Sequence, residues 1–120
     1  MIGEEARKKL IHDGLIKVVP IALLRGRTFL NSFCLIDEVQ NCNYEAFKTI
    51  ITRIGEGSKY VLMGDIGQID FKHKGASALE KMVSLFKDDP EIGTFEFTEE
   101  DVVRHPIITH ILNKLKEIEK

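Results

Sequence analysis

Apolar residues recur along the chain in two patterns, and each pattern predicts a different kind of element. Two short runs, residues 33–37 and 60–63, are apolar almost without polar alternation. Such runs are typical of strands that are buried on both faces. Elsewhere apolar residues recur every three or four positions, which predicts amphipathic helices. We expect these helices over residues 4–11 and 44–53, after Ser77 and after Pro106.

Residues that start or stop helices support this division. Asn43 and Ser77 are favoured N-caps for the second and third helices, and Pro106 suits the first turn of the last one. Two further strands are predicted at 16–19 and 95–98, from a short apolar run and from alternating polarity.

Strands that alternate with helices predict βαβ units. The expected fold class is therefore α/β, with a parallel sheet between helices in a three-layer αβα arrangement. A length of 120 residues corresponds to one domain or part of one, and 43% hydrophobic residues can supply its core. We expect residues 1–120 to form a single partial domain.

Charge and cysteine content exclude several classes of protein. A net charge of -2 shows no basic excess of the kind that indicates nucleic-acid binding, although a local basic groove stays possible. Cys34 and Cys42 form neither a disulfide framework nor a zinc-ligand pattern, so a reducing, cytoplasmic setting is expected. The N-terminus does not resemble a signal peptide, and no run approaches the roughly 18 apolar residues that span a bilayer.

Two adjacent carboxylates, Asp37 and Glu38, end the first apolar run. Open α/β sheets bind ligands at the carboxyl ends of their strands. An apolar run followed by Asp-Glu has the form of a Walker B element, in which the Asp holds Mg²⁺ and the Glu positions or deprotonates water. The alternative is a polar turn at the end of an ordinary strand.

A similar polar segment, residues 64–70, follows the second apolar run. Two neighbouring parallel strands would bring its Asp65 and Gln68 to the same sheet edge as Asp37 and Glu38. An amide such as that of Gln68 can donate to a γ-phosphate and accept from water at once. A Gly/Asp turn that carries a surface glutamine is the alternative.

Three arginines are candidates for phosphate contacts. Arg104 precedes the last helix and could act as an arginine finger, which stabilises the charge on a phosphoryl group during its transfer. Arg25 and Arg27 flank a glycine in a segment suited to nucleic-acid phosphates. A plain surface charge or an exposed loop explains each of them equally well on local grounds.

Five ordered blocks together resemble the PhoH-like family of ATPases. They are PIALLRGRT at 20–28, FCLIDEVQN at 33–41, TRIGEGSK at 52–59, GDIGQID at 64–70 and FTEEDVVRHP at 97–106. Their order and spacing fit as well, across residues 18–112. The resemblance implies a RecA-like P-loop NTPase core related to superfamily 1 helicases, ATP dependence, links to phosphate starvation and RNA metabolism, and ring formation.

The resemblance also implies a role for each candidate residue. Asp37 would hold Mg²⁺ and Glu38 would be the catalytic base. Gln40 and Gln68 would sense the γ-phosphate, while Asp65 would support the metal or water network.

The arginines receive roles in the same way. Arg104 would be the arginine finger and would reach the nucleotide of a neighbouring subunit. Arg25 and Arg27 are the weaker candidates, for contact with RNA.

The sequence departs from the family pattern in two places. Gly67 stands where the family usually has threonine, and no Gly-x-x-x-x-Gly-Lys-Ser/Thr loop is present. Without that loop the backbone cradle and the lysine for the β- and γ-phosphates are missing. We therefore expect the carboxyl-terminal half of an ATPase domain, using ATP and Mg²⁺ only with a chain that supplies the phosphate loop, as a homo-oligomer or a hetero-complex. A non-catalytic RNA-binding or subunit-interaction module and a vestigial fragment are the alternatives.

Overall fold

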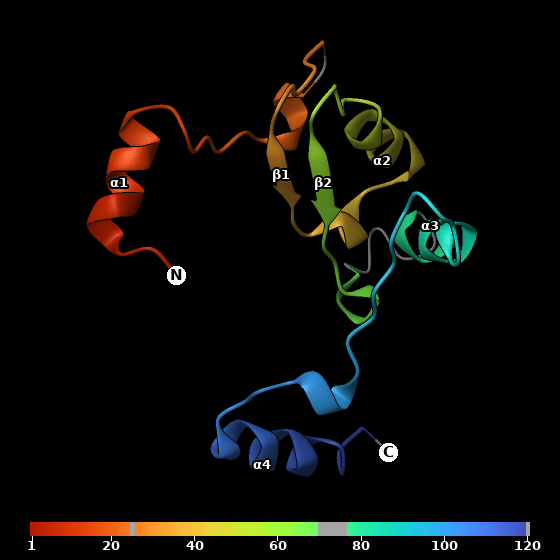
Figure 1. Cartoon of the computed structure of the whole chain (residues 1–120). Helices are drawn as coiled ribbons and strands as arrows, with labels where there is room; N and C mark the ends of the chain where they lie inside the picture. Colours follow the sequence, from red (N-terminus) through yellow and green to blue (C-terminus); the bar gives the residue numbers. More distant parts are fainter. Residues whose placement is uncertain (25, 70–76, 120) are drawn as a thin grey trace. The chain divides into compact units, whose positions relative to one another are not determined.

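The computed structural model describes residues 1–24, 26–69 and 77–119 (Figure 1). Within these ranges four α-helices and two strands follow one another. In order they are α1 (Glu4–His12), β1 (Phe33–Ile36), α2 (Tyr44–Ile51), β2 (Lys59–Leu62), α3 (Leu79–Phe86) and α4 (Pro106–Leu115). Contacts group the chain into two compact units, Met1–Leu85 and Phe86–Lys120, which are described separately below.

The first unit is built on a parallel pair of strands. Phe33 lies opposite Lys59 and Ile36 opposite Leu62, so the pair is in register along its whole length. The ladder continues past the strands, because the Met63 N–H donates to the Ile36 carbonyl at 2.8 Å. The predicted α/β class with parallel pairing is confirmed, in a partial form with a two-stranded sheet among the described residues.

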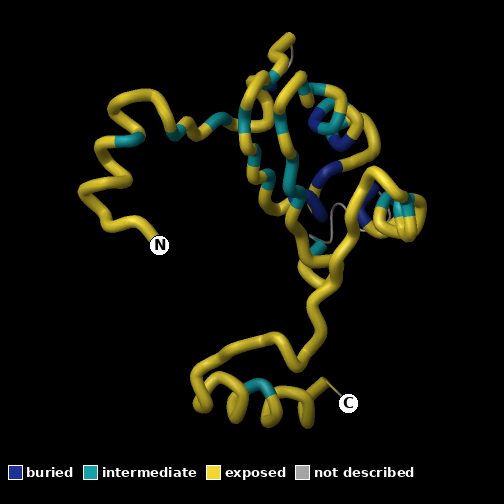
Figure 2. Tube along the Cα trace, in the orientation of Figure 1, coloured by how far each residue is buried: buried dark blue, intermediate teal, exposed yellow. Residues whose placement is uncertain are grey.

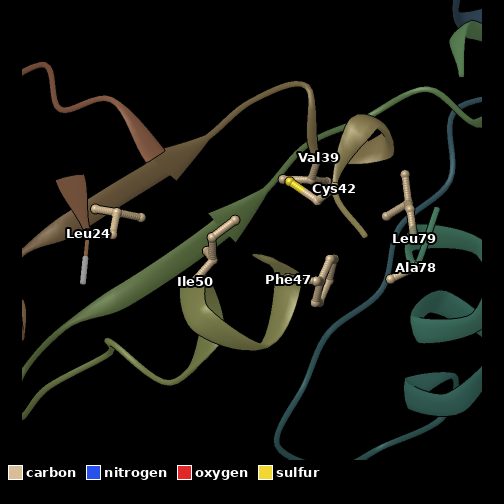
Figure 3. Close-up of a cluster of buried hydrophobic side chains, with 7 residues drawn as sticks. All are labelled: Leu24, Val39, Cys42, Phe47, Ile50, Ala78 and Leu79. Atoms are coloured by element: carbon tan, nitrogen blue, oxygen red, sulfur yellow. The ribbon is translucent and has the colours of Figure 1, made fainter. Parts of the chain in front are cut away.

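One face of this sheet carries the hydrophobic core (Figure 2). Ile36, Tyr60 and Leu62 pack there against a buried cluster drawn in Figure 3. The cluster joins the segment before β1, the turn after it, α2 and the start of α3. Its members are Leu24, Val39, Cys42, Phe47, Ile50, Ala78 and Leu79.

The opposite face of β1 is open. Phe33 is 66% exposed and Leu35 is 63% exposed, although both belong to the uninterrupted apolar run. The expectation that this strand is buried on both faces is therefore wrong for the described residues. The physical reason is that side chains alternate across a strand, and α2 covers only one side of the pair.

Helix starts follow the local signals in two of three cases. Asn43 caps α2 as predicted, and its side chain accepts from the Ala46 N–H at 2.9 Å. Pro106 begins α4, with His105 accepting from the Ile107 N–H. Ser77 does not cap α3, because the helix begins only at Leu79.

The two additional strands predicted at 16–19 and 95–98 do not form. Both segments are described, and neither is assigned to a strand. Phe95 and Phe97 instead stack edge to face, with ring centroids 5.1 Å apart. A strand is stabilised by its neighbours, and no described segment pairs with these two.

The second unit contains α4 and a short 3₁₀ turn, Glu99–Asp101, closed by a capping box with Thr98. None of its described residues is buried. The helix turns a row of half-exposed isoleucines and leucines outward, including Ile108, Ile111 and Leu115. Across the described residues, no helix has the length and apolar character needed to cross a bilayer.

Candidate functional site at the end of the parallel strands

Acidic and amide side chains from both strand ends meet at one edge of the sheet. Asp37 and Glu38 directly follow β1, while Asp65 and Gln68 lie in the segment that follows β2. Gln40 joins the two sides, because its Oε1 accepts from the Asp65 N–H at 3.2 Å. Parallel pairing thus brings the side chains that follow β1 and β2 together, as expected. The structure by itself does not assign a chemical role to each of them.

Glu38 has an unusual backbone conformation. This residue has φ 58° and ψ 29°, a left-handed conformation that non-glycine residues adopt infrequently. The Glu38 N–H donates to Asp37 Oδ1 at 2.8 Å, which holds the Asp37 carboxylate against the backbone of Glu38. The chain then enters a 3₁₀ turn, Val39–Asn41, and the Val39 N–H donates to the Met63 carbonyl at 3.1 Å. Glu38 is therefore presented to solvent at the sheet edge.

Gln40 is the buried member of the group, with 1% of its surface exposed. Its Nε2 donates to Glu38 Oε2, and its Oε1 faces the backbone of Asp65. A Cβ atom on Gly64 would lie 2.8 Å from Gln40 Oε1 and 2.8 Å from a methyl carbon of Leu79. Only glycine fits at position 64 without moving these neighbours.

Asp65 organises the segment after β2. Its Oδ1 accepts from the Gly67 N–H at 2.8 Å, and its Oδ2 accepts from Gln68 Nε2 at 2.8 Å. These bonds cap the short 3₁₀ turn Ile66–Gln68 and leave Gln68 exposed at the edge. A Cβ at Gly67 would lie 3.2 Å from Asp65 Oδ1, so this turn is tight around the carboxylate.

The carboxylates suit Mg²⁺ in the way that nucleotide sites use it. Among the described residues, no three His, Cys, Asp or Glu side chains converge into a metal cage. Mg²⁺ in such sites needs only one or two carboxylates, because water and phosphate oxygens supply the other ligands. Asp37 matches this use: it is exposed, and in the described structure only its Oδ1 accepts a hydrogen bond.

The three predicted arginines lie in separate parts of the chain, and each is described by itself. Arg104 belongs to the second unit and is exposed, and no hydrogen bond or ion pair engages its guanidinium among the described residues. Arg27 is exposed after Gly26, whose φ of 74° is left-handed. Arg25 lies outside the described residues.

Two features of the site were not predicted from the sequence. One is the burial of Gln40, because this side chain was expected to contact the γ-phosphate. The other is the need for glycine at position 64, for which the only sequence signal is a glycine directly before the candidate residue Asp65.

Two thiols flank the site on the core side. Cys34 lies within β1 and Cys42 follows the turn that holds Gln40. Burial raises the pKa of both thiols above the ordinary cysteine value. Cys42 is therefore a small apolar core residue, Cys34 is a half-buried residue of β1, and the raised pKa disfavours the reactive thiolate in both.

Comparison with known proteins places these features in a family. The sequence pattern of the family described as "PhoH-like protein" matches residues 1–116. A PhoH-like protein of Mycobacterium bovis is 38% identical over 120 residues, which is 100% of this chain and 34% of the relative. A PhoH-like protein of Bacillus subtilis is 34% identical over 112 residues, covering 93% of this chain and 35% of the relative.

A more distant match points the same way. Protein PhoH of Escherichia coli is 34% identical over 100 residues, covering 83% of this chain and 28% of the relative. The chain thus spans about a third of the length of the curated relatives it matches. One family pattern covers both structural units, although contacts divide the chain into two. The prediction that residues 1–120 form a single partial domain therefore stays a prediction. The chain therefore belongs to the PhoH-like protein family.

Proposed function

We propose that the chain carries the Walker B side of an ATP-hydrolysing site. The observation that carries this proposal is the hydrogen-bonded group at one sheet edge. There Asp37 and Glu38 from one strand end are linked through Gln40 to Asp65 and Gln68 from the other. The family membership supports a nucleotide as the ligand.

In this proposal each exposed side chain has one task. Asp37 offers a carboxylate oxygen to Mg²⁺, which would neutralise charge on the phosphates. Glu38 accepts a proton from the attacking water, or orients it. Gln68 contacts the γ-phosphate, and Asp65 holds the Gln68 amide in place at 2.8 Å. Arg104 stabilises the transferring phosphoryl group on a neighbouring subunit of a ring.

The proposal requires a phosphate loop from elsewhere. The 120 residues contain no Gly-x-x-x-x-Gly-Lys-Ser/Thr sequence, and most of this chemistry is phosphate positioning. We propose that a segment carrying that loop, with the rest of a family domain, completes the site. The exposed outer face of β1, with Phe33 and Leu35, is the surface on which we place this segment.

The test compares the chain alone with the chain mixed with a phosphate-loop segment from a full-length relative. Calorimetry and phosphate release should show no appreciable Mg-ATP binding or turnover for the chain alone, and turnover for the mixture. Glu38→Gln in the mixture should keep ATP binding and lose turnover, because the amide cannot take the proton. Micromolar Mg-ATP binding by the chain alone would contradict the requirement for the loop. Turnover that survives Glu38→Gln would show that Glu38 is not the catalytic base.

A role in RNA binding is a second candidate, favoured by one observation. Arg27 is exposed at a left-handed glycine turn, where its charge is free for a phosphate contact. RNA binding measured by fluorescence anisotropy should weaken with added salt and with Arg27→Ala. Binding that responds to neither change argues against this candidate.

A further inference from the structure

We propose that Gln40 is a positioning residue that couples the Asp65–Gln68 turn to the carboxylate of Glu38. The coupling itself is a property of the free protein. Its catalytic meaning rests on the proposed function, in which Gln68 contacts the γ-phosphate and Glu38 handles the water. In this inference Gln40 does not touch the nucleotide, although the family resemblance assigned it a sensing role.

The burial of Gln40 supports its assignment as a positioning residue. Gln40 is 1% exposed, and its side-chain oxygen and nitrogen both have partners within the protein. A ligand could reach the amide only by displacing Glu38 or Asp65. Leaving a buried amide unpaired is unfavourable, because the group loses its water partners and gains none in the protein. The amide is therefore held where it is, between the two strand ends.

The bonds form one continuous path across the site. Gln68 Nε2 donates to Asp65 Oδ2, the Asp65 N–H donates to Gln40 Oε1, and Gln40 Nε2 donates to Glu38 Oε2. Asp65 and Gln40 are 25 residues apart in sequence, so no local backbone segment can replace this link. A displacement of Gln68 is thus transmitted to the catalytic carboxylate through two side chains and one peptide group.

The path works in only one orientation of the Gln40 amide. Turning the amide over would place its NH₂ group against the Asp65 N–H and its oxygen against the Glu38 carboxylate. Both contacts would then be repulsive. Gly64 leaves the space that this end of the Gln40 amide occupies, because a Cβ there would lie 2.8 Å from Gln40 Oε1. Position 40 therefore requires a donor and an acceptor on one side chain of this length.

Backbone NMR of the ¹⁵N-labelled full chain without nucleotide tests the coupling. Glu38→Ala should shift the amide resonances of Asp65, Gly67 and Gln68. In a Gln40→Met background, which keeps the length and removes both polar groups, the same substitution should leave those three resonances unmoved. Shifts of equal size in both backgrounds, or no shifts in the native background, would overturn the proposal.

A second variant separates coupling from simple packing. Gln40→Glu keeps an acceptor for the Asp65 N–H and, at a pH high enough to ionise both carboxyls, has no proton to donate to Glu38. It should preserve the slow hydrogen exchange of the Asp65 amide and abolish the response of residues 65–68 to Glu38→Ala. A preserved response would contradict the proposal even if Gln40→Met fails to fold.

The matched control is Glu45→Ala, an exposed carboxylate in the first turn of α2. It should shift none of the three resonances in any background, and a shift there would mean that the response is not specific to Glu38. No nucleotide is present in these experiments. A failure of ATP hydrolysis would therefore overturn the proposed function and leave the coupling standing, while absent transmission would overturn the coupling alone.

Discussion

A missing side chain at Gly64 shapes the candidate site at the residue scale. Gly64→Ala would place its Cβ 2.8 Å from Gln40 Oε1 and 3.1 Å from the Gln40 backbone nitrogen. We expect the free energy of unfolding to fall by about 1–3 kcal/mol, the usual cost of overpacking. Urea denaturation monitored by circular dichroism measures this free energy. Gly93→Ala is the control, because nothing lies within 4 Å of its Cβ position; an equal loss in both variants would contradict the prediction.

Burial of the two thiols predicts a pH dependence. The raised pKa values mean that folding favours the protonated thiols of Cys34 and Cys42. Their contribution to stability is present below the ordinary cysteine pKa and is lost as the pH rises through the raised value. Iodoacetamide labelling followed by peptide mass spectrometry should be slow at pH 8 in the folded chain and fast in urea. Cys42 should react more slowly than Cys34, because it is 7% exposed; fast labelling of folded Cys42 contradicts this.

The sequence reveals residue types more readily than their partners. Asp37, Glu38, Asp65 and Gln68 could be selected because carboxylates and amides directly follow apolar runs. The inward direction of Gln40 could not be predicted. It depends on a turn that begins with left-handed Glu38 and on space left by Gly64, which is 24 positions after Gln40. Such long-range fits have no local sequence pattern.

At the scale of elements, α2 depends on its first residue. Asn43→Ala removes the side-chain acceptor that the Ala46 N–H uses at 2.9 Å. We expect a loss of about 1 kcal/mol in unfolding free energy, because one helix-end donor is left unpaired. Asn43→Asp keeps an acceptor oxygen and should lose much less. Thermal or urea unfolding checks both; equal losses would mean that the cap is not the cause.

Helices were more predictable than strands for a physical reason. The starts at Asn43 and Pro106 were read correctly, because caps and proline act within one helical turn. The segments 16–19 and 95–98 have strand-like patterns but no partner among the described residues. Strand formation depends on residues that are distant in sequence, which a local pattern cannot report.

For the whole molecule, the open face of β1 is the feature with the clearest consequence. Leu35→Lys should weaken binding of the phosphate-loop segment by roughly tenfold or more, since burying a leucine contributes about 1.5–3 kcal/mol. Sedimentation velocity or calorimetry on the mixture measures this. The control is Leu23→Lys, a leucine that is 60% exposed outside the sheet. Equal effects of the two substitutions would argue that the segment does not bind the open face of β1. If the chain self-associates through this face when the segment is absent, the face binds a second copy of the chain instead.

The parallel register also constrains how the protein can be made. A ribosome releases β1 well before β2, and the intervening residues must close as a crossover before the strands can pair. During that interval Phe33 and Leu35 have neither a sheet partner nor a covered face, so the nascent chain is exposed to aggregation. The acidic pair at 37–38 is likewise synthesised long before the turn that completes its network. Ordering of the site is thus a late event in synthesis, and a chaperone that holds the emerging β1 would cover Phe33 and Leu35 until β2 can pair with it.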